Sequence, residues 1–222
     1  MKATRDLRRL QSSAIYRLGM IEDAALDAMT SGSASGVKVD AALSHCTVEL
    51  HNLWHGFSRA LYLSAAFRAR DGAGVRLTLS KVSQAQSVDE ALTHAIRRCK
   101  PRKRVPAKPA WTWFDEPSWA KVANLLDSLD AIGSSNTPHV SAALSATPSV
   151  FEHVNAFRNF YAHRNEQTAG ALRPTIIGYG LPSDLHATEV LLSHAIAPGG
   201  SRPQPVILDW ISDVRSTLEQ IV

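Results

Sequence analysis

The chain has few cysteines and no long apolar run, which argues against a disulfide-stabilised protein and against a membrane-spanning one. Its 222 residues include only Cys46 and Cys99, in unrelated contexts, so neither a disulfide framework nor a zinc knuckle is expected. No stretch approaches the roughly 18 uninterrupted apolar residues that a membrane-spanning helix needs. The first ten residues, MKATRDLRRL, are charged and lack the apolar run of a signal peptide. We therefore expect one cytoplasmic domain without membrane association.

Several common catalytic signatures are also missing. The sequence contains no phosphate-cradling glycine loop, no nucleophile elbow and no Cys-His pair. His51 and His55 have a spacing that can bind zinc, but Asn52 stands where a metalloprotease helix has its glutamate, and no third ligand is evident. We expect no metal and no cofactor, and interpret these histidines as surface or groove-lining residues.

The positive charge is concentrated in one place. The net charge is +4, from 24 Lys and Arg against 20 Asp and Glu, and six of the cations lie in RRCKPRKR, residues 97–104. We predict that this run is a flexible arm or loop that binds RNA phosphates; a solvated loop is the alternative. Its cations are Arg97, Arg98, Lys100, Arg102, Lys103 and Arg104.

Aromatic residues follow the basic run closely. They are Trp111, Trp113, Phe114 and Trp119. Aromatic rings beside cations suit stacking of single-stranded RNA, but exposed tryptophan clusters are uncommon, so core packing is the favoured interpretation.

Hydrophobic periodicity predicts an all-α fold. The expected helices cover residues 15–29, 39–69, 87–98, 117–132, about 148–165, 184–196 and 205–221. TSGSASG at 30–36 and APGGSRP at 197–203 are expected breaks, VRLTLS at 75–80 is expected to be a short isolated strand, and RPTIIGYGLPSD at 173–184 is expected to be irregular. The second helix should be the longest. The segment from about 71 to 117 is an elaboration between helices.

The helix expected to begin near residue 148 carries two stripes, one apolar and one polar. Thr147 can cap it, and Val150, Val154, Phe157 and Tyr161 repeat at the spacing of a core-facing stripe. Successive helical residues turn by about 100°, so Asn155, Asn159 and His163 line another stripe, roughly opposite the core. Arg158 lies about 140° round the axis from His163, within reach of a long side chain.

Cleavage of RNA by its own 2′-hydroxyl would use such a set. A base must accept a proton near neutral pH, which suits His163. Charge builds up on the phosphate oxygens, which suits the guanidinium of Arg158. Asn159 could hold the phosphate or the imidazole by hydrogen bonds, and Arg164 adds a cation for RNA. Capping and helix-dipole interactions are the structural alternative for these residues.

The segment RNFYAH, residues 158–163, resembles the Arg-polar-x-x-x-His signature of the HEPN superfamily of all-helical domains. ELHNLWHGFSRALYLSAAF, residues 49–67, resembles the aromatic-rich helix before the insertion in a prokaryotic branch of that superfamily. The resemblance covers about residues 10–168. It implies a bundle of four to five core helices, with an insertion at about 71–117 between the second and third core helices. The helices expected after it form a C-terminal extension at about 184–222, in which no resemblance is recognised.

The resemblance also implies an activity. It predicts a metal-independent endoribonuclease that works as a homodimer, with Arg158 and His163 carrying the cleavage and Asn159 supporting them. Such proteins are commonly toxins or effectors of defence against phage, so an antitoxin or another defence protein is an expected partner. The alternative is a non-catalytic HEPN module that serves as antitoxin, scaffold or nucleotide- or RNA-binding partner. A basic-loop DNA-binding protein ranks last, because no recognition helix is recognisable.

Overall fold

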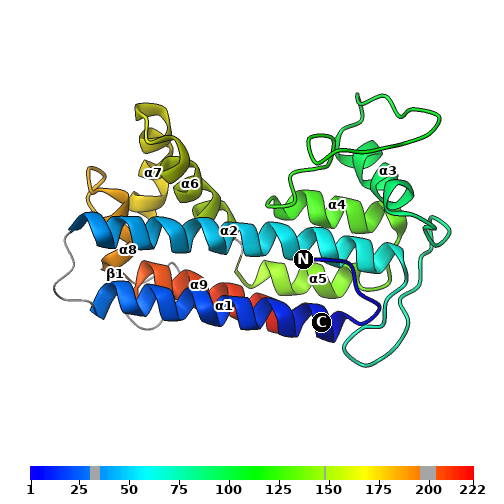
Figure 1. The fold of residues 1–222 in the computed structure, drawn as a ribbon, viewed down its shortest axis with the longest axis horizontal. Coiled ribbons are helices and arrows are strands. Elements are labelled where there is room, and N and C mark those ends of the chain that lie inside the picture. The colour runs from blue at the N-terminus through cyan, green and yellow to red at the C-terminus, as the bar shows by residue number, and fades with distance from the viewer. Residues whose placement is uncertain (31–35, 148, 196–203) are drawn as a thin grey trace. The chain divides into compact units, whose positions relative to one another are not determined.

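The computed structural model describes residues 1–30, 36–147, 149–195 and 204–222, and these are mostly helical, with almost no strand (Figure 1). The helices are α1 (Leu7–Thr30), α2 (Gly36–Ala66), α3 (Val88–Cys99), α4 (Val122–Ile132), α5 (Thr137–Ser145), α6 (Val150–His163), α7 (Glu166–Gly178), α8 (Ala187–Leu192) and α9 (Val206–Gln220). Strands β1 (His194–Ala195) and β2 (Gln204–Pro205) pair antiparallel. The predicted all-α class is confirmed. The predicted breaks at 30–36 and 197–203 lie almost wholly outside the described residues.

The chain divides into two compact units. The first unit contains residues 1–15, 53–148 and 217–222, and the second contains residues 16–52 and 149–216. α1, α2 and α9 each contribute residues to both units. Within the described ranges, no helix combines the length and the apolar character needed to cross a membrane.

The first unit is built on the carboxyl-terminal half of α2. The Trp54 indole donates to the carbonyl of Ala120 at 3.1 Å, and the Tyr62 ring stacks on that of Trp119 with 5.2 Å between centroids. The buried carboxylate of Glu116 accepts from the Arg59 guanidinium and from the Trp119 indole. A buried charge is tolerated only when it is paired and hydrogen-bonded, as this one is. The segment that leads into α4 therefore packs on a side of α2 that carries both apolar and ionic contacts.

The second unit contains the predicted motif helix. All four residues of its predicted core stripe are buried: Val150, Val154, Phe157 and Tyr161. The Phe157 ring packs edge-on against Trp210 of α9, with 5.0 Å between centroids. The core-facing periodicity of α6 is therefore confirmed. α2 is the longest of the described helices, as predicted.

Five local expectations were wrong. α1 begins at Leu7, well before the predicted start, and α5 was not predicted at all. α7 occupies residues predicted to be the frayed end of the motif helix and irregular chain. Thr147 does not cap α6: Ser149 precedes the helix without a side-chain cap, and the Thr147 hydroxyl is 2.7 Å from that of Thr217. The segment 75–80 forms isolated bridges and no regular strand.

Candidate functional site

The carboxyl-terminal end of α6 carries the motif residues. α6 ends at His163 because Arg164 adopts a left-handed conformation, with φ 43°, while its backbone N–H still donates to the carbonyl of Phe160. Asn165 then caps α7: its Oδ1 accepts from the backbone N–H of Thr168 at 2.9 Å. A single residue therefore separates the end of the motif helix from the cap of the next helix, and His163 stands at this corner.

Arg158 is half-buried and only partly satisfied. Its Nη1 donates to Oδ1 of Asn159 at 3.1 Å, while its Nε is buried and has no acceptor among the described residues. A buried donor without a partner costs about 1–3 kcal/mol. No carboxylate of the described residues pairs with this guanidinium, so its positive charge is not neutralised locally. Asn159 holds the guanidinium, and the structure records no hydrogen bond from it to His163.

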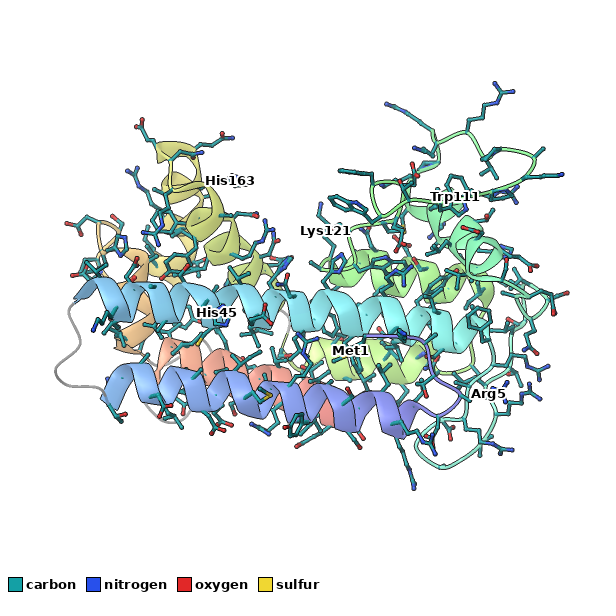
Figure 2. All side chains as sticks on the ribbon, viewed as in Figure 1. Met1, Arg5, His45, Trp111, Lys121 and His163 are labelled. Atoms are coloured by element: carbon teal, nitrogen blue, oxygen red, sulfur yellow. The ribbon has the colours of Figure 1, made fainter. Side chains whose placement is uncertain are left out.

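His163 is exposed at the last position of α6, where Figure 2 labels it. Within the described part of the chain, the structure records no hydrogen bond or ion pair for its imidazole. Arg158 and His163 are thus near each other in sequence but are not joined by a direct contact. One copy of the chain presents an accessible imidazole and, separately, a guanidinium fixed by Asn159.

Arg164 differs from both, because its charge is neutralised. Its Nη2 donates to Oδ2 of Asp40 on α2 at 2.8 Å, and its guanidinium carbon lies 5.6 Å from the centre of the Tyr161 ring. The Thr188 hydroxyl donates to the other oxygen of Asp40. Burial raises the pKa of Asp40, but the hydrogen bonds from Thr188 and Arg164 outweigh it, and the pKa lies below its usual value. Arg164 thus links the corner after α6 to Asp40 of α2, and Asp40 in turn binds Thr188 of α8.

A second group of titratable residues, not predicted from the sequence, lies between α6, α7 and α9. The Trp210 indole donates to the Tyr179 hydroxyl at 2.7 Å, and that hydroxyl lies 3.4 Å from Nδ1 of His153. Burial lowers the pKa of His153 and raises that of Tyr179 to about 12. Burial, followed by the negative charge of Asp209, raises the pKa of Asp213 to about 6. In the sequence, the only indication of this group is the spacing of Asp209 and Asp213, four residues apart on α9.

The basic run is more ordered than predicted. Residues 97–99 belong to α3, and Arg98 pairs with Asp127 at 2.9 Å. Lys103 pairs with Asp115, and the Lys100 ammonium donates to the carbonyl of Phe114 at 3.1 Å. In the described ranges, four of the six cations have no carboxylate partner. These are Arg97, Lys100, Arg102 and Arg104.

The aromatic residues after the basic run divide into buried and exposed ones. Trp119 is fully buried, and half-buried Trp111 (Figure 2) donates from its indole to the Thr93 hydroxyl at 2.9 Å. The side chains of Trp113 and Phe114 are 75 % and 72 % exposed, and their rings stack with 3.7 Å between centroids. Core packing therefore accounts for Trp119 and partly for Trp111, while the stacked pair remains on the surface beside the basic run.

No described set of three His, Cys, Asp or Glu side chains is arranged to bind a metal ion. No protein-family model, curated protein or solved structure matches the chain. The resemblance to the HEPN superfamily therefore rests on the RNFYAH motif, on its position at the end of a helix, and on the aromatic-rich second helix.

Proposed function

We propose that this chain is a metal-independent endoribonuclease of the HEPN type, and that Arg158, Asn159 and His163 form its catalytic set. One observation carries the proposal: Arg158, His163 and Arg164 lie at the end of α6, and their side chains are used differently. Arg164 is neutralised by Asp40, whereas Arg158 and His163 pair with no carboxylate among the described residues. The unpaired guanidinium of Arg158 and the exposed imidazole of His163 are the groups that binding and cleavage of a phosphodiester require.

The chemistry follows from the three side chains. The imidazole of His163 accepts the proton of an RNA 2′-hydroxyl, whose oxygen attacks the adjacent phosphorus. The bond to the 5′-oxygen breaks, that oxygen takes up a proton, and a 2′,3′-cyclic phosphate remains. The Arg158 guanidinium binds the phosphate oxygens on which charge accumulates. Asn159 orients Arg158, since its Oδ1 accepts from that guanidinium.

A homodimer would complete this set. Proton removal and proton donation require two groups, and the motif of one chain contains a single histidine, His163. A two-fold axis would bring a second copy of the motif to the same phosphate. In this proposal the enzyme is cytoplasmic and acts as a toxin or an effector of defence against phage. An antitoxin or another defence protein would hold it inactive.

The test is controlled expression in bacterial cells. Wild type, Arg158→Ala and His163→Ala are induced in parallel, growth is followed, and total RNA is run on a denaturing gel. Arg173→Ala and His45→Ala serve as matched controls, because both residues are exposed and lie in the second unit outside the motif. We expect growth arrest and RNA fragmentation with the wild type and both controls. Normal growth with intact RNA for all five proteins would refute the proposal.

The exposed Trp113 and Phe114 pair favours a second candidate function, a non-catalytic RNA-binding module. Stacking of a base on an aromatic ring contributes about 1–3 kcal/mol, and the adjacent cations contact phosphates without requiring a sequence. This candidate predicts that purified wild type and His163→Ala bind single-stranded RNA equally and leave it intact. Trp113→Ala would weaken the binding of both.

A further inference from the structure

The first unit contains a cavity of about 680 Å³ whose charged residues are all arginines. The four arginines are Arg5, Arg68, Arg70 and Arg76. No Asp or Glu lines the cavity, and the other walls are made by small, apolar or amide residues: Ala3, Thr4, Phe67, Gln84, Ala85 and Gln86. Its size falls within the range of small-molecule sites. Figure 2 labels Arg5, where the amino-terminal segment meets the loop that follows α2.

Backbone pairing brings these arginines together from distant positions. The N–H of Arg70 donates to the carbonyl of Arg5, and the carbonyl of Arg70 accepts from the N–H of Leu7, both at 2.9 Å. On its other side Arg70 forms an antiparallel bridge with Arg76. Bridge partners project their side chains on the same face, so two like charges stand opposite each other.

Neutral backbone carbonyls hold three of the guanidiniums in place. Arg68 Nε donates to the carbonyl of Leu77 at 3.2 Å, and Arg70 Nη1 donates to that of Gly74 at 2.8 Å. Arg76 Nε donates to the carbonyl of Arg68 at 3.3 Å. These bonds restrict the side chains without neutralising their charge, and no carboxylate of the described residues forms an ion pair with any of the four arginines.

The two nearest acidic residues in the sequence are engaged elsewhere. Asp6 Oδ1 accepts from the backbone N–H of Arg8 at the start of α1. Asp71 Oδ1 accepts from the N–H groups of Ala73 and Val75 in the turn after α2. Both carboxylates therefore stabilise backbone. The repulsion between Arg70 and Arg76 is left uncompensated within the first unit.

The end of α2 fixes the backbone of Arg68 at the cavity. Arg68 has φ 55°, in the left-handed region, and closes the helix: its N–H donates to the carbonyl of Ala65, and the N–H of Ala69 donates to that of Ser64. A bound anion would offset the repulsion between Arg70 and Arg76.

We propose that this cavity binds a small ligand carrying adjacent phosphate groups, such as the triphosphate of a nucleotide. Planar guanidiniums match phosphate oxygens in pairs, and several of them facing one space suit several neighbouring phosphates better than one. Phe67 and Ala85 give one wall an apolar character, and the amides of Gln84 and Gln86 can bond to a sugar or base. The site is separate from the α6 motif, so this proposal stands whether or not the chain cleaves RNA.

The experiment uses the purified full chain without magnesium. Binding of ATP, AMP and inorganic tripolyphosphate is measured by isothermal titration calorimetry, and thermal unfolding is followed with and without each ligand. The test variants are Arg70→Gln and Arg76→Gln. Arg9→Gln is the matched control, because Arg9 is an exposed arginine of the first unit that does not line the cavity. Arg158→Ala separates this site from the proposed cleavage site.

We expect ATP and tripolyphosphate to bind the wild type, Arg9→Gln and Arg158→Ala alike, and AMP to bind more weakly. Loss of one charge-assisted contact should weaken ATP binding at least about tenfold in Arg70→Gln and Arg76→Gln. Without ligand, Arg76→Gln should melt no lower than the wild type, since it relieves repulsion. ATP binding much tighter than tripolyphosphate would identify a nucleotide, and equal binding a bare phosphate chain.

Three results would overturn the proposal. The first is absence of binding by both polyphosphates to the wild type. The second is equal binding by the wild type and both cavity variants. The third is Arg76-dependent binding of a single-stranded RNA oligomer but of neither polyphosphate, which would assign the cavity to an RNA backbone.

Discussion

The basic run at 97–104 and the arginine cavity belong to the same unit, yet their charges are used in opposite ways. In the basic run, two of the six cations pair with carboxylates and a third donates to a backbone carbonyl. In the cavity, three arginines also donate to carbonyls, but none of the four pairs with an acid among the described residues. The region that is most basic in sequence is thus partly neutralised in the fold, while arginines scattered in sequence form the more concentrated charge.

The end of α6 repeats this contrast between paired and unpaired charges at a smaller scale. Arg164 has Asp40 as its counter-ion, and Arg158 has only the amide of Asn159. A paired arginine stabilises the fold, and an unpaired one is available to a ligand. Changes to paired groups should therefore alter stability, and changes to unpaired groups should alter binding or catalysis.

The largest expected effect is on catalysis. His163→Ala should lower RNA cleavage by about 10²–10⁴-fold, the usual contribution of a general acid or base. The melting temperature should not change, because the imidazole is exposed and makes no recorded contact in the described structure. Cleavage of a fluorescent RNA by purified protein measures the rate, and calorimetry measures the melting temperature. A variant that cleaves at the wild-type rate would contradict the role of His163.

Asp40→Asn should reduce stability by about 2 kcal/mol, because a carboxylate that accepts charge-assisted hydrogen bonds from Arg164 and Thr188 is lost. Urea unfolding at pH 7 measures the difference, and Asp184→Asn, an exposed residue of the same unit, is the control.

The depressed pKa of Asp40 also sets a pH dependence. Because the folded-state pKa lies below the usual value, the contribution of Asp40 is present above about pH 4 and disappears as the pH falls through the folded-state value. Asp40→Asn should remove this part of the acid-induced loss. Equal stability of wild type and Asp40→Asn at pH 7 would show that the ion pair is structurally neutral.

A smaller effect is expected at Asp213, where the sign is reversed. Its folded-state pKa of about 6 lies above the unfolded value, so its stabilising contribution is complete below about pH 4 and is lost as the pH rises through 6. Asp213→Asn should therefore be more stable than the wild type at pH 7.5 by about 1 kcal/mol, a figure that allows for solvent screening of this half-buried group. Urea unfolding between pH 4 and 8 measures the trend. A constant difference across that range would contradict it.

The smallest effects are expected in the basic run. Arg98→Ala should cost less than about 1 kcal/mol of stability, because its ion pair with Asp127 is exposed. Arg102→Ala should leave stability unchanged but lower the slope of log affinity for RNA against log salt by about one. Fluorescence anisotropy at several salt concentrations measures that slope. Equal slopes for the two variants would show that pairing with Asp127 does not withhold Arg98 from RNA.

Periodic burial was predictable from the sequence, and the α6 core stripe is the clearest case. Val150, Val154 and Phe157 follow the helical repeat and are buried, because one helix face against a core leaves a direct mark on the sequence. α7 was missed because it contains Gly170 and Pro174, which usually interrupt helices. Pro174 is exposed, and the Asn165 capping box compensates for part of the lost helical bonding.

The contacts around the motif could not be predicted, because they depend on residues far apart in the chain. Spacing showed that Arg158 and His163 share a helix, but it gave no indication that Asn159 would hold the guanidinium. Nor did it show that Asp40 would neutralise Arg164, 124 positions away. The arginine cavity was missed for the same reason: Arg5 reaches Arg70 only through backbone pairing with the loop after α2.

The left-handed turn at Arg164 has an evolutionary consequence. The residue must serve both as the geometric corner between α6 and α7 and as the cation that Asp40 binds. A glycine would accept the φ angle but lose the charge, and a lysine would keep the charge but not the planar guanidinium that contacts both Asp40 and the Tyr161 ring. A substitution of Asp40 should therefore change which residues selection favours at position 164. In a lineage of this protein, we expect the two positions to be replaced together.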